Sequence, residues 1–353
     1  MTTYHSTSQQ AVGRAVLTSI NGVGNFLAWT GIDTKQNLNF NFQPKDMTFK
    51  KGMISDNGVR CSNYGPDLVV LPDEKTAYII WADKDNVVKI TKMSRTKILD
   101  EKKIPNQTKP SAYSWSDWAL DGKDIPVLNS NAASGPCAAL GHQNGQSVLN
   151  VLWQDFDKGV IAFTQLPVFG TSSFESLEME ILQGDLKASS TPALVMEGGR
   201  SFLAYFDKDK QFNLAIDPLG GLSFTSHYSI KGVTSNFSPA FLPIASGQAY
   251  LFWVDDKTTK LHYQQIGTVA KHGGWALNPT KGCGGTVSEA LPSGAPSVQS
   301  MSIENPDTHV MEKKFRVAWP DDKERGVHAH TVRYTSDVAI NHAAMPVVIV
   351  TAS

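Results

Sequence analysis

A short apolar run that ends in Trp or Tyr recurs six times along this chain of 353 residues, and an Asp follows each run within four residues. Successive copies are separated by 48 (205 to 253) to 72 (81 to 153) residues. The terminal aromatic residues are Trp29, Trp81, Trp153, Tyr205, Trp253 and Trp319. A unit of about fifty residues built of strand, turn and strand is typical of a β-propeller blade. The sequence therefore predicts an all-β fold, a six-bladed β-propeller, as one domain spanning 1–353.

The repeat extends upstream of the apolar run, because five of the six units have a small residue and a Pro before it. These pairs are Gly65-Pro66, Gly135-Pro136, Thr191-Pro192, Ser238-Pro239 and Ala295-Pro296. Pro lacks a backbone N–H and is suited to the first position of a strand. We expect each blade to run from an innermost strand after the Pro, through the aromatic strand and the Asp turn, to a third strand and a variable outer strand. The first unit lacks the Pro, as expected for a terminal repeat.

The repeated aromatic residues and the Asp residues both have structural interpretations. Blades pack face to face, so their inner strands are buried on both sides and the aromatic residue is expected in the core between blades. The Asp side chain is expected to accept hydrogen bonds from the backbone of a tight turn. A calcium loop needs more carboxylates at alternating positions than these turns contain. We therefore expect no metal site and no cofactor.

Charge and composition exclude several classes of protein. The formal net charge is −1 and the basic residues are scattered, which argues against a nucleic-acid partner. The first ten residues contain no apolar segment typical of a signal peptide, and the run Met345–Val350 is too short to cross a membrane. The three cysteines form no C-x-x-C pair and are expected to be free thiols. These features predict a cytoplasmic protein, or one exported without a classical signal peptide, that has no membrane partner.

The segment 104–131 is longer than a blade connection requires and contains Tyr113, Trp115, Asp117 and Trp118. Aromatic rings interleaved with polar side chains suit a surface that stacks on a sugar ring and binds its hydroxyl groups. We therefore predict these four residues as ligand-binding residues. The alternative is that Trp115 and Trp118 belong to a fourth strand and are buried against the next blade.

Three further candidates lie in the last two units. Trp275, in a glycine-rich stretch, is predicted as a ligand-binding residue at a rim, although a glycine-rich loop with an anchored Trp is the favoured alternative. His262 and His328 are predicted as polar ligand-binding residues because they lie in what we expect to be equivalent third strands. His328 and His330 are two residues apart and share one face of a strand, but zinc would require a third ligand. A solvated strand face is the favoured interpretation of this pair.

The six units resemble the fungal fucose-specific lectins of the Aleuria type. The resemblance is carried by second strands such as 250–253 (YLFW) and third strands such as 260–265 (KLHYQQ), and covers nearly the whole chain. It implies a six-bladed propeller with sugar pockets between adjacent blades. Each pocket would use an Arg from the third strand, a Glu from the next strand and an aromatic side chain from the neighbouring blade. The corresponding third-strand positions here hold Asn39, Lys89, Ala162, Asn213, His262 and His328, none of which is Arg.

Two functions of different classes are compatible with the sequence. The first is a lectin-like, carbohydrate-binding propeller without catalysis, which the repeat pattern and the absence of catalytic motifs favour. The second is an enzyme with a single pocket for a small-molecule ligand. It could be a glycoside-processing enzyme or a pericyclase similar to the fungal hetero-Diels–Alderases, which orient two reactive partners without a conspicuous catalytic motif. A protein-interaction platform is a third interpretation.

The end of the chain is predicted to close the ring. The segment 346–351 (PVVIVT) is rich in β-branched residues and follows the last unit without a repeat of its own. We expect it to join the sheet that begins with Gly13–Ile20, which would remove an exposed edge.

Overall fold

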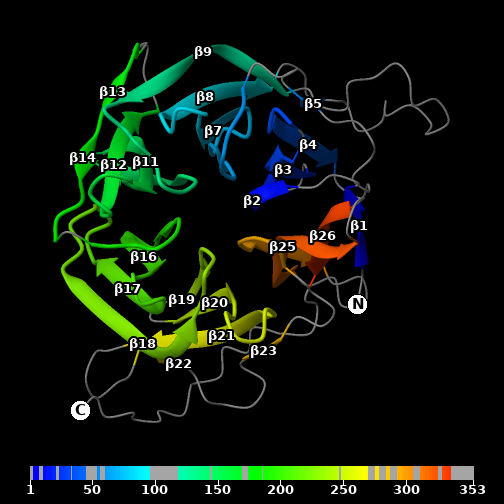
Figure 1. Cartoon of the computed structure of the whole chain (residues 1–353), viewed down its shortest axis with the longest axis vertical. Coiled ribbons are helices and arrows are strands. Elements are labelled where there is room, and N and C mark those ends of the chain that lie inside the picture. The colour runs from blue at the N-terminus through cyan, green and yellow to red at the C-terminus, as the bar shows by residue number, and fades with distance from the viewer. Residues whose placement is uncertain are drawn as a thin grey trace.

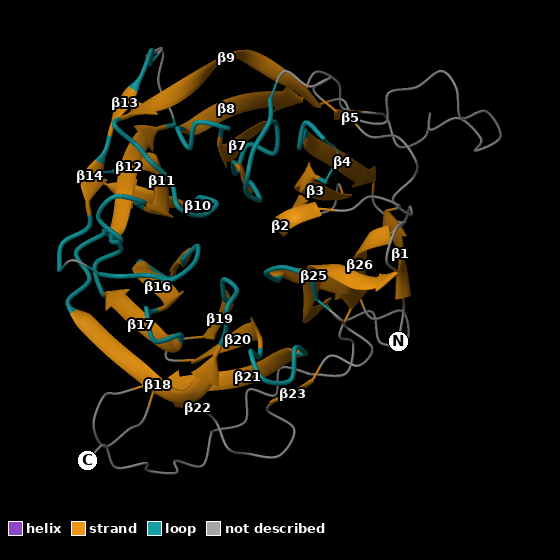
Figure 2. Ribbon diagram, in the orientation of Figure 1, coloured by secondary structure: helices purple, strands orange, loops and turns teal. Residues whose placement is uncertain are grey.

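The fold is described from a computed structural model, for residues 3–7, 11–20, 24–32, 34–44, 54–55, 60–95, 118–143, 145–168, 174–184, 186–245, 248–268, 275–277, 284–286, 292–304, 311–324 and 328–334. Within these residues every regular element is a strand (Figure 2). The strands form separate twisted sheets arranged around a centre, as in a β-propeller (Figure 1). The predicted all-β fold and propeller arrangement are therefore confirmed.

The described strands form six sheets, which we number along the chain. Sheet 1 contains β2 (Ala11–Ile20), β3 (Gly24–Gly31), β4 (Leu38–Pro44) and β5 (Ile54–Ser55). Sheet 2 contains β6 (Asp67–Val70), β7 (Thr76–Ala82), β8 (Val88–Arg95) and β9 (Trp118–Leu128), with β13 (Leu177–Glu178) added in parallel at the outer edge. Sheet 3 contains β10 (Cys137–Gln143), β11 (Gln146–Gln154), β12 (Ile161–Pro167) and β14 (Glu180–Ile181).

The other three sheets repeat this order from the centre outward. Sheet 4 contains β15 (Ala193–Glu197), β16 (Arg200–Phe206), β17 (Gln211–Asp217) and β18 (Ser226–Thr234). Sheet 5 contains β19 (Ala240–Ala245), β20 (Gln248–Val254), β21 (Leu261–Thr268), β22 (Trp275–Leu277) and β23 (Gly284–Thr286). Sheet 6 contains β24 (Ser297–Glu304), β25 (Met311–Glu324), β26 (His328–Tyr334) and β1 (Thr3–Thr7).

The repeat in the sequence corresponds to the repeat in space. Each of the six aromatic residues lies in the second strand of its sheet, in β3, β7, β11, β16, β20 and β25 respectively. Each of the five repeated prolines immediately precedes the first strand of its sheet. These first strands are β6, β10, β15, β19 and β24. The missing N–H of Pro therefore falls just outside the ladder of hydrogen bonds, as the sequence predicted.

The core lies between the sheets. Phe26 of sheet 1 packs with Trp81 and Trp118 of sheet 2 in one buried cluster, and Phe202 of sheet 4 packs with Trp253 and Trp275 of sheet 5 in another. The repeated aromatic residues are all buried, which confirms that they belong to the core between sheets. Because each sheet is covered on both faces, the second strands are continuously hydrophobic rather than alternating.

The innermost strands are held together by close backbone contacts and one ion pair. An atom placed at the Cβ position of Gly135 would lie 2.4 Å from the carbonyl oxygen of Gly65, so the two backbones touch. Nearby, Arg14 Nη2 of β2 lies 2.6 Å from Asp67 Oδ2 of β6. The same oxygen accepts a hydrogen bond from the N–H of Ala138 in β10, at 2.8 Å. Asp67 therefore links the first strands of three successive sheets.

The last sheet is completed by the start of the chain. The N-terminal strand β1 pairs antiparallel with β26, with Thr3 opposite Arg333. Sheet 6 thus combines residues from the two ends of the described chain (Figure 1). The segment 346–351, predicted to be the closing strand, lies outside the described residues, so its assignment remains a prediction.

The last unit departs from the predicted pattern in two ways. Strand β25 continues five residues beyond Trp319, so Asp321 lies within a strand and not in a turn. The residue paired with Trp319 is Thr331, whereas His328 pairs with Glu324. The prediction that His328 occupies the third-strand position equivalent to His262 is therefore wrong, because the longer hairpin shifts the register.

None of the described residues belongs to a helix that could cross a membrane.

Candidate functional site

The rim between sheets 1 and 2 contains a cluster of charged side chains around one indole ring. Trp81 in β7 pairs with Lys89 in β8, which places the lysine side chain over the ring. Lys89 Nζ lies 5.4 Å from the ring centroid, within the range of a cation–π contact. The same ammonium group lies 2.7 Å from Asp83 Oδ2. One lysine therefore contacts both an aromatic face and a carboxylate.

The turn between β7 and β8 fixes the position of Asp83. Its Oδ1 accepts hydrogen bonds from the backbone N–H groups of Asp85 and Val87, each at 2.9 Å. This confirms the predicted capping role of the repeated Asp, which Asp155, Asp207 and Asp255 also perform in their own turns. Because Oδ1 is used by the turn, Oδ2 is free to receive Lys89.

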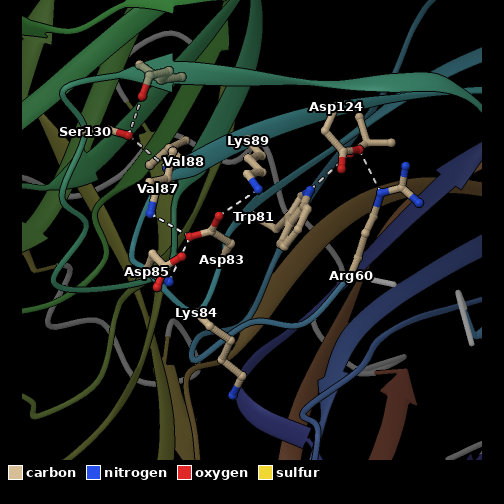
Figure 3. Close-up of polar contacts among 12 residues, drawn as sticks. Arg60, Trp81, Asp83, Lys84, Asp85, Val87, Val88, Lys89, Asp124 and Ser130 are labelled. Atoms are coloured by element: carbon tan, nitrogen blue, oxygen red, sulfur yellow. Dashed lines mark hydrogen bonds and ion pairs between the residues drawn. The ribbon is translucent and has the colours of Figure 1, made fainter. Parts of the chain in front are cut away.

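A second set of polar contacts lies on the other side of the indole (Figure 3). Trp81 Nε1 donates to Thr91 Oγ1 at 3.0 Å, and Thr91 Oγ1 donates to Asp124 Oδ1 at 2.7 Å. Arg60 Nε also donates to Asp124 Oδ1, at 2.7 Å. Trp81 is thus flanked by two ion pairs, Lys89–Asp83 and Arg60–Asp124.

The polar groups of this cluster differ in their access to solvent. The side chains of Lys89 and Asp124 are 28% and 23% exposed, whereas that of Arg60 is 9% exposed. The buried arginine holds the carboxylate in place, and the more exposed ammonium and carboxylate groups remain within reach of a ligand. The cluster can therefore present a hydrogen-bond donor and an acceptor on either side of a fixed aromatic residue.

The same strand positions in the other sheets have different side chains. In sheet 4, Asn213 pairs with Tyr205 and donates to Asp207 Oδ2 at 2.9 Å. In sheet 3 the position opposite Trp153 is Ala162, which cannot form such a contact. In the described part of the chain, only sheet 2 combines an ammonium group over the ring with a carboxylate from its fourth strand.

In sheet 5 this position is occupied by His262, a predicted site residue. Its imidazole stacks on Trp253 with the ring centroids 5.4 Å apart and the planes at 25°. Partial burial lowers the pKa of His262 below its ordinary value of 6.5; the carboxylate of Asp255 opposes this effect and Lys260 adds to it. The imidazole is therefore held mainly in its neutral form near pH 7.

Two of the tryptophans predicted to bind a ligand, Trp118 and Trp275, lie within the described residues, and both are buried. Trp118 begins β9, the fourth strand of sheet 2, and is only 3% exposed, with its ring 5.4 Å from that of Phe26. Trp275 lies in β22 and packs against Phe202. For Trp118 the alternative interpretation, burial in a fourth strand, is correct. Trp275 is anchored in the core, in agreement with its alternative interpretation, but it lies in a short strand. They are core residues because apolar partners on the neighbouring sheet cover them.

The remaining predicted site residues cannot be placed. Tyr113, Trp115 and Asp117 lie outside the described residues, and for His328 the description covers the backbone only. Within the described part of the chain, no three His, Cys, Asp or Glu side chains are grouped as ligands for a metal ion.

Sequence reasoning missed Arg60 and Asp124. Both lie outside the repeated phrase, Arg60 before the first strand of sheet 2 and Asp124 in its variable fourth strand. One signal for this cluster was present in the sequence. The second unit has a cation, Lys89, in its third strand and an acidic residue, Asp124, two positions before a Pro in its fourth strand.

No protein-family model matches the chain, and no curated protein matches it. Among solved structures, the fold is similar to AofleA from Arthrobotrys oligospora, at 9% identity over 94% of this chain and 85% of that chain, with a TM-score of 0.58. It is similar to Trypanosoma rangeli sialidase in complex with the inhibitor DANA, at 10% identity over 93% of this chain and 55% of that chain, with a TM-score of 0.55. The fucose-specific lectin from Aleuria aurantia aligns at 9% identity over 90% of this chain and 91% of that chain, with a TM-score of 0.48. At such low identities, the similarity to the first two proteins establishes that the chain has a β-propeller fold.

Proposed function

We propose that this protein is a lectin-like, carbohydrate-binding propeller without catalysis, and that it binds a glycan at the rim between sheets 1 and 2. The observation that carries the proposal is the placement of Trp81 between the Lys89–Asp83 and Arg60–Asp124 ion pairs. Trp81 is itself only 2% exposed and holds these polar groups in place. The ion-paired side chains around it offer donors and acceptors, which suits a sugar whose hydroxyl groups both donate and accept hydrogen bonds.

The individual groups have complementary tasks in this proposal. An ammonium group has three N–H donors, and Lys89 uses one of them toward Asp83, so the others can donate to sugar oxygens. Asp124 receives its described hydrogen bonds at Oδ1, which leaves Oδ2 to accept from a sugar hydroxyl. Arg60 holds this carboxylate in a fixed orientation through its contact with Oδ1. Each carboxylate is already engaged by a cation, and such fixed hydrogen-bonding groups suit a site that holds a ligand.

We further propose that the ring has six blades, one for each described sheet. The supporting observation is that the first strands contact one another in a closed series, from β2 through β6, β10, β15, β19 and β24 back to β2. One protein with which this chain shares its fold is the Trypanosoma rangeli sialidase in complex with the inhibitor DANA. A glycan ligand is consistent with that relationship.

The proposal is tested with Lys89→Met, which keeps the apolar stem but removes the ammonium group, and with Asp124→Asn. Lys208→Met is the matched control, because Lys208 is an exposed lysine at the equivalent turn of sheet 4. The wild type and Lys208→Met should bind the same glycans on an array of neutral and acidic glycans, and both site variants should lose at least tenfold in affinity by calorimetry. Absence of binding by the wild type across the array, or unchanged binding by both site variants, would contradict the proposal.

A further inference from the structure

Phe156 is an aromatic residue on the surface of the turn between β11 and β12, and it is 64% exposed. It lies three residues after Trp153, the repeated aromatic residue of sheet 3. The residues at the same spacing in sheets 2, 4 and 5 are Lys84, Lys208 and Asp256. Sheet 3 therefore presents a phenyl ring to solvent at a position where these three sheets have a charged side chain.

The main chain that carries this ring is fixed by hydrogen bonds. Phe156 N–H donates to the carbonyl oxygen of Asn131, in the connection between sheets 2 and 3, at 2.7 Å. Asp155 is 2% exposed, and its Oδ1 accepts a hydrogen bond from the N–H of Lys158 at 2.9 Å. The carbonyl oxygen of Asp155 accepts the N–H of Gly159, also at 2.9 Å. A ligand that binds to this turn therefore has little backbone entropy to remove.

The ring of Phe156 is not needed to join the sheets, as a comparison with sheet 5 shows. There Asp256 N–H donates to the carbonyl oxygen of Thr234 at 3.3 Å, and Asp256 Oδ1 accepts a hydrogen bond from Thr234 Oγ1 at 2.5 Å. Both the backbone and the side chain of Asp256 thus contact the connection from the preceding sheet. Phe156 makes the same backbone contact but leaves most of its side chain in water.

Two polar side chains flank Phe156. Asn131 accepts the N–H of Phe156 at its backbone carbonyl, and its Nδ2 donates to Oδ2 of Asp157, the next residue in the turn, at 3.0 Å. The Asn131 amide has a second N–H and a carbonyl oxygen beyond this contact, and the Asp157 carboxylate has a second oxygen. An exposed flat ring is therefore accompanied by a fixed pair of groups that can donate and accept hydrogen bonds.

These surroundings suit a small amphipathic ligand better than a protein partner. The exposed large apolar residues of the described chain are scattered, one in or after a strand of each of sheets 1 to 4: Ile32, Leu128, Phe156 and Leu219. The core of a protein interface is depleted of charged residues, whereas Phe156 is followed by the exposed Asp157 and Lys158. A pyranose has a face of C–H groups, which the negative face of an aromatic ring attracts, and hydroxyl groups at its edge.

From these observations we propose that Phe156 and the Asn131–Asp157 pair form a second sugar-binding platform, at the boundary of sheets 2 and 3. The C–H face of a pyranose stacks on the phenyl ring, and its hydroxyl groups bind to the amide and the carboxylate. The platform has no residue in common with the proposed glycan site at Trp81, and it does not depend on that site. Two sites on one chain would allow a glycan with several sugar units to be held by avidity.

The test follows the ring signals of ¹³C-labelled phenylalanine by NMR while the full chain is titrated with methyl β-D-glucopyranoside. All ring hydroxyl groups of this glucoside are equatorial, so both faces of its ring consist of C–H groups. Sorbitol is the matched control, because it carries hydroxyl groups on an open chain and has no ring face. The signal that Phe156→Lys removes should shift with the glucoside and stay fixed with sorbitol.

Three variants separate the contributions to binding. Phe156→Lys, which introduces the residue type found in sheets 2 and 4, should abolish the shifts of the backbone amide signals of the turn. Asp157→Ala keeps the ring and should weaken binding about fivefold, as expected for the loss of one hydrogen bond. Leu219→Lys replaces another exposed apolar residue, in sheet 4, and should leave the response unchanged.

A Phe156 signal that stays fixed up to the solubility limit of the glucoside would overturn the proposal, as would an equal response to sorbitol or unchanged amide shifts in Phe156→Lys. A Phe156 signal that shifts with protein concentration and not with the glucoside would show a contact between copies of the chain and would also overturn it. Lys89→Met should leave the Phe156 response intact. Failure of this platform is therefore distinguishable from failure of the glycan site between sheets 1 and 2.

Discussion

Arg14 and Asp67 form an ion pair of 2.6 Å between the innermost strands of two adjacent sheets. Their side chains are only 12% and 11% exposed, and Asp67 also accepts the backbone N–H of Ala138 from a third sheet. The pair therefore joins neighbouring sheets beside the point where the backbones of Arg14 and Gly65 approach closely.

Replacing Arg14 by Met should destabilise the protein by about 3 kcal/mol, because it leaves a largely buried carboxylate without its cation. The free energy of unfolding would be measured by urea denaturation. Lys89→Met is the comparison, since the Lys89–Asp83 pair is more exposed and its loss should cost about 1 kcal/mol or less. Equal losses in the two variants would show that the inner pair has no special role in joining the sheets.

Gly135→Ala should destabilise the protein by about 1–3 kcal/mol through overpacking. The added Cβ would lie 2.4 Å from the carbonyl oxygen of Gly65, so one backbone has to move. Gly285→Ala is the control, because the nearest atoms to its new Cβ, at 3.2 Å and beyond, belong to the Tyr263 side chain, which can shift. Thermal denaturation of the two variants should show a lower midpoint for Gly135→Ala, and a wild-type midpoint for that variant would contradict the close approach of these strands.

Asp255 should make stability depend on pH in the acid range. Partial burial acts to raise its pKa, but hydrogen bonds from the N–H and hydroxyl groups of Thr258 and from the N–H of Lys257 outweigh this and lower the pKa below 3.8. A carboxyl group with a lowered pKa in the folded state stabilises the fold above the unfolded-state pKa. This contribution is lost as the pH falls through the folded-state value.

The wild type should therefore lose more stability than Asp255→Asn between about pH 5 and pH 2. Asp209→Asn is the control, because Asp209 is an exposed acid in the equivalent turn whose carboxylate accepts no described hydrogen bond. Thermal midpoints measured across this range should fall with the same slope in Asp209→Asn as in the wild type. A matching slope in Asp255→Asn would show that this cap does not contribute.

Trp118→Ala should unfold the protein or destabilise it by about 3–5 kcal/mol, because it leaves a cavity between sheets 1 and 2. Trp118→Phe keeps an aromatic ring against Phe26 and should retain most of the stability. Circular dichroism melts would distinguish the two. A stable, folded Trp118→Ala variant would show that the ring is not needed between the sheets and would restore its candidacy as a ligand contact.

Much of the fold could be predicted because the propeller repeats a local chemical pattern. A Pro before the first strand, an aromatic residue in the second and an Asp in the turn each have a local physical cause, which a single sequence reveals. The last unit escaped this reasoning because β25 runs past Asp321, and the length of a hairpin depends on how its partner strand pairs. The position of β1 beside β26 is a contact between the two ends of the chain, for which no local pattern exists.

The candidate site could be predicted only in part, for the same reason. His262 and Lys89 occupy repeat positions and were recognised as third-strand residues, whereas Arg60 and Asp124 meet only after sheets 1 and 2 pack together. Trp118 looked like a binding residue because a tryptophan outside the repeat has no assigned neighbour in the sequence. In the structure, Phe26 from the preceding sheet is that neighbour.

The pairing of β1 with β26 has a consequence for how the chain is synthesised. On the ribosome the first five residues of the described chain emerge long before their partner strand, so they must wait unpaired while almost all other strands are translated. Until His328–Tyr334 emerges, β1 has no partner and sheet 6 cannot be completed, although β24 and β25 can already pack against sheet 1. The nascent chain is therefore exposed to aggregation until this repeat has been translated, and slowing translation of the repeat should increase the fraction of protein that requires a chaperone.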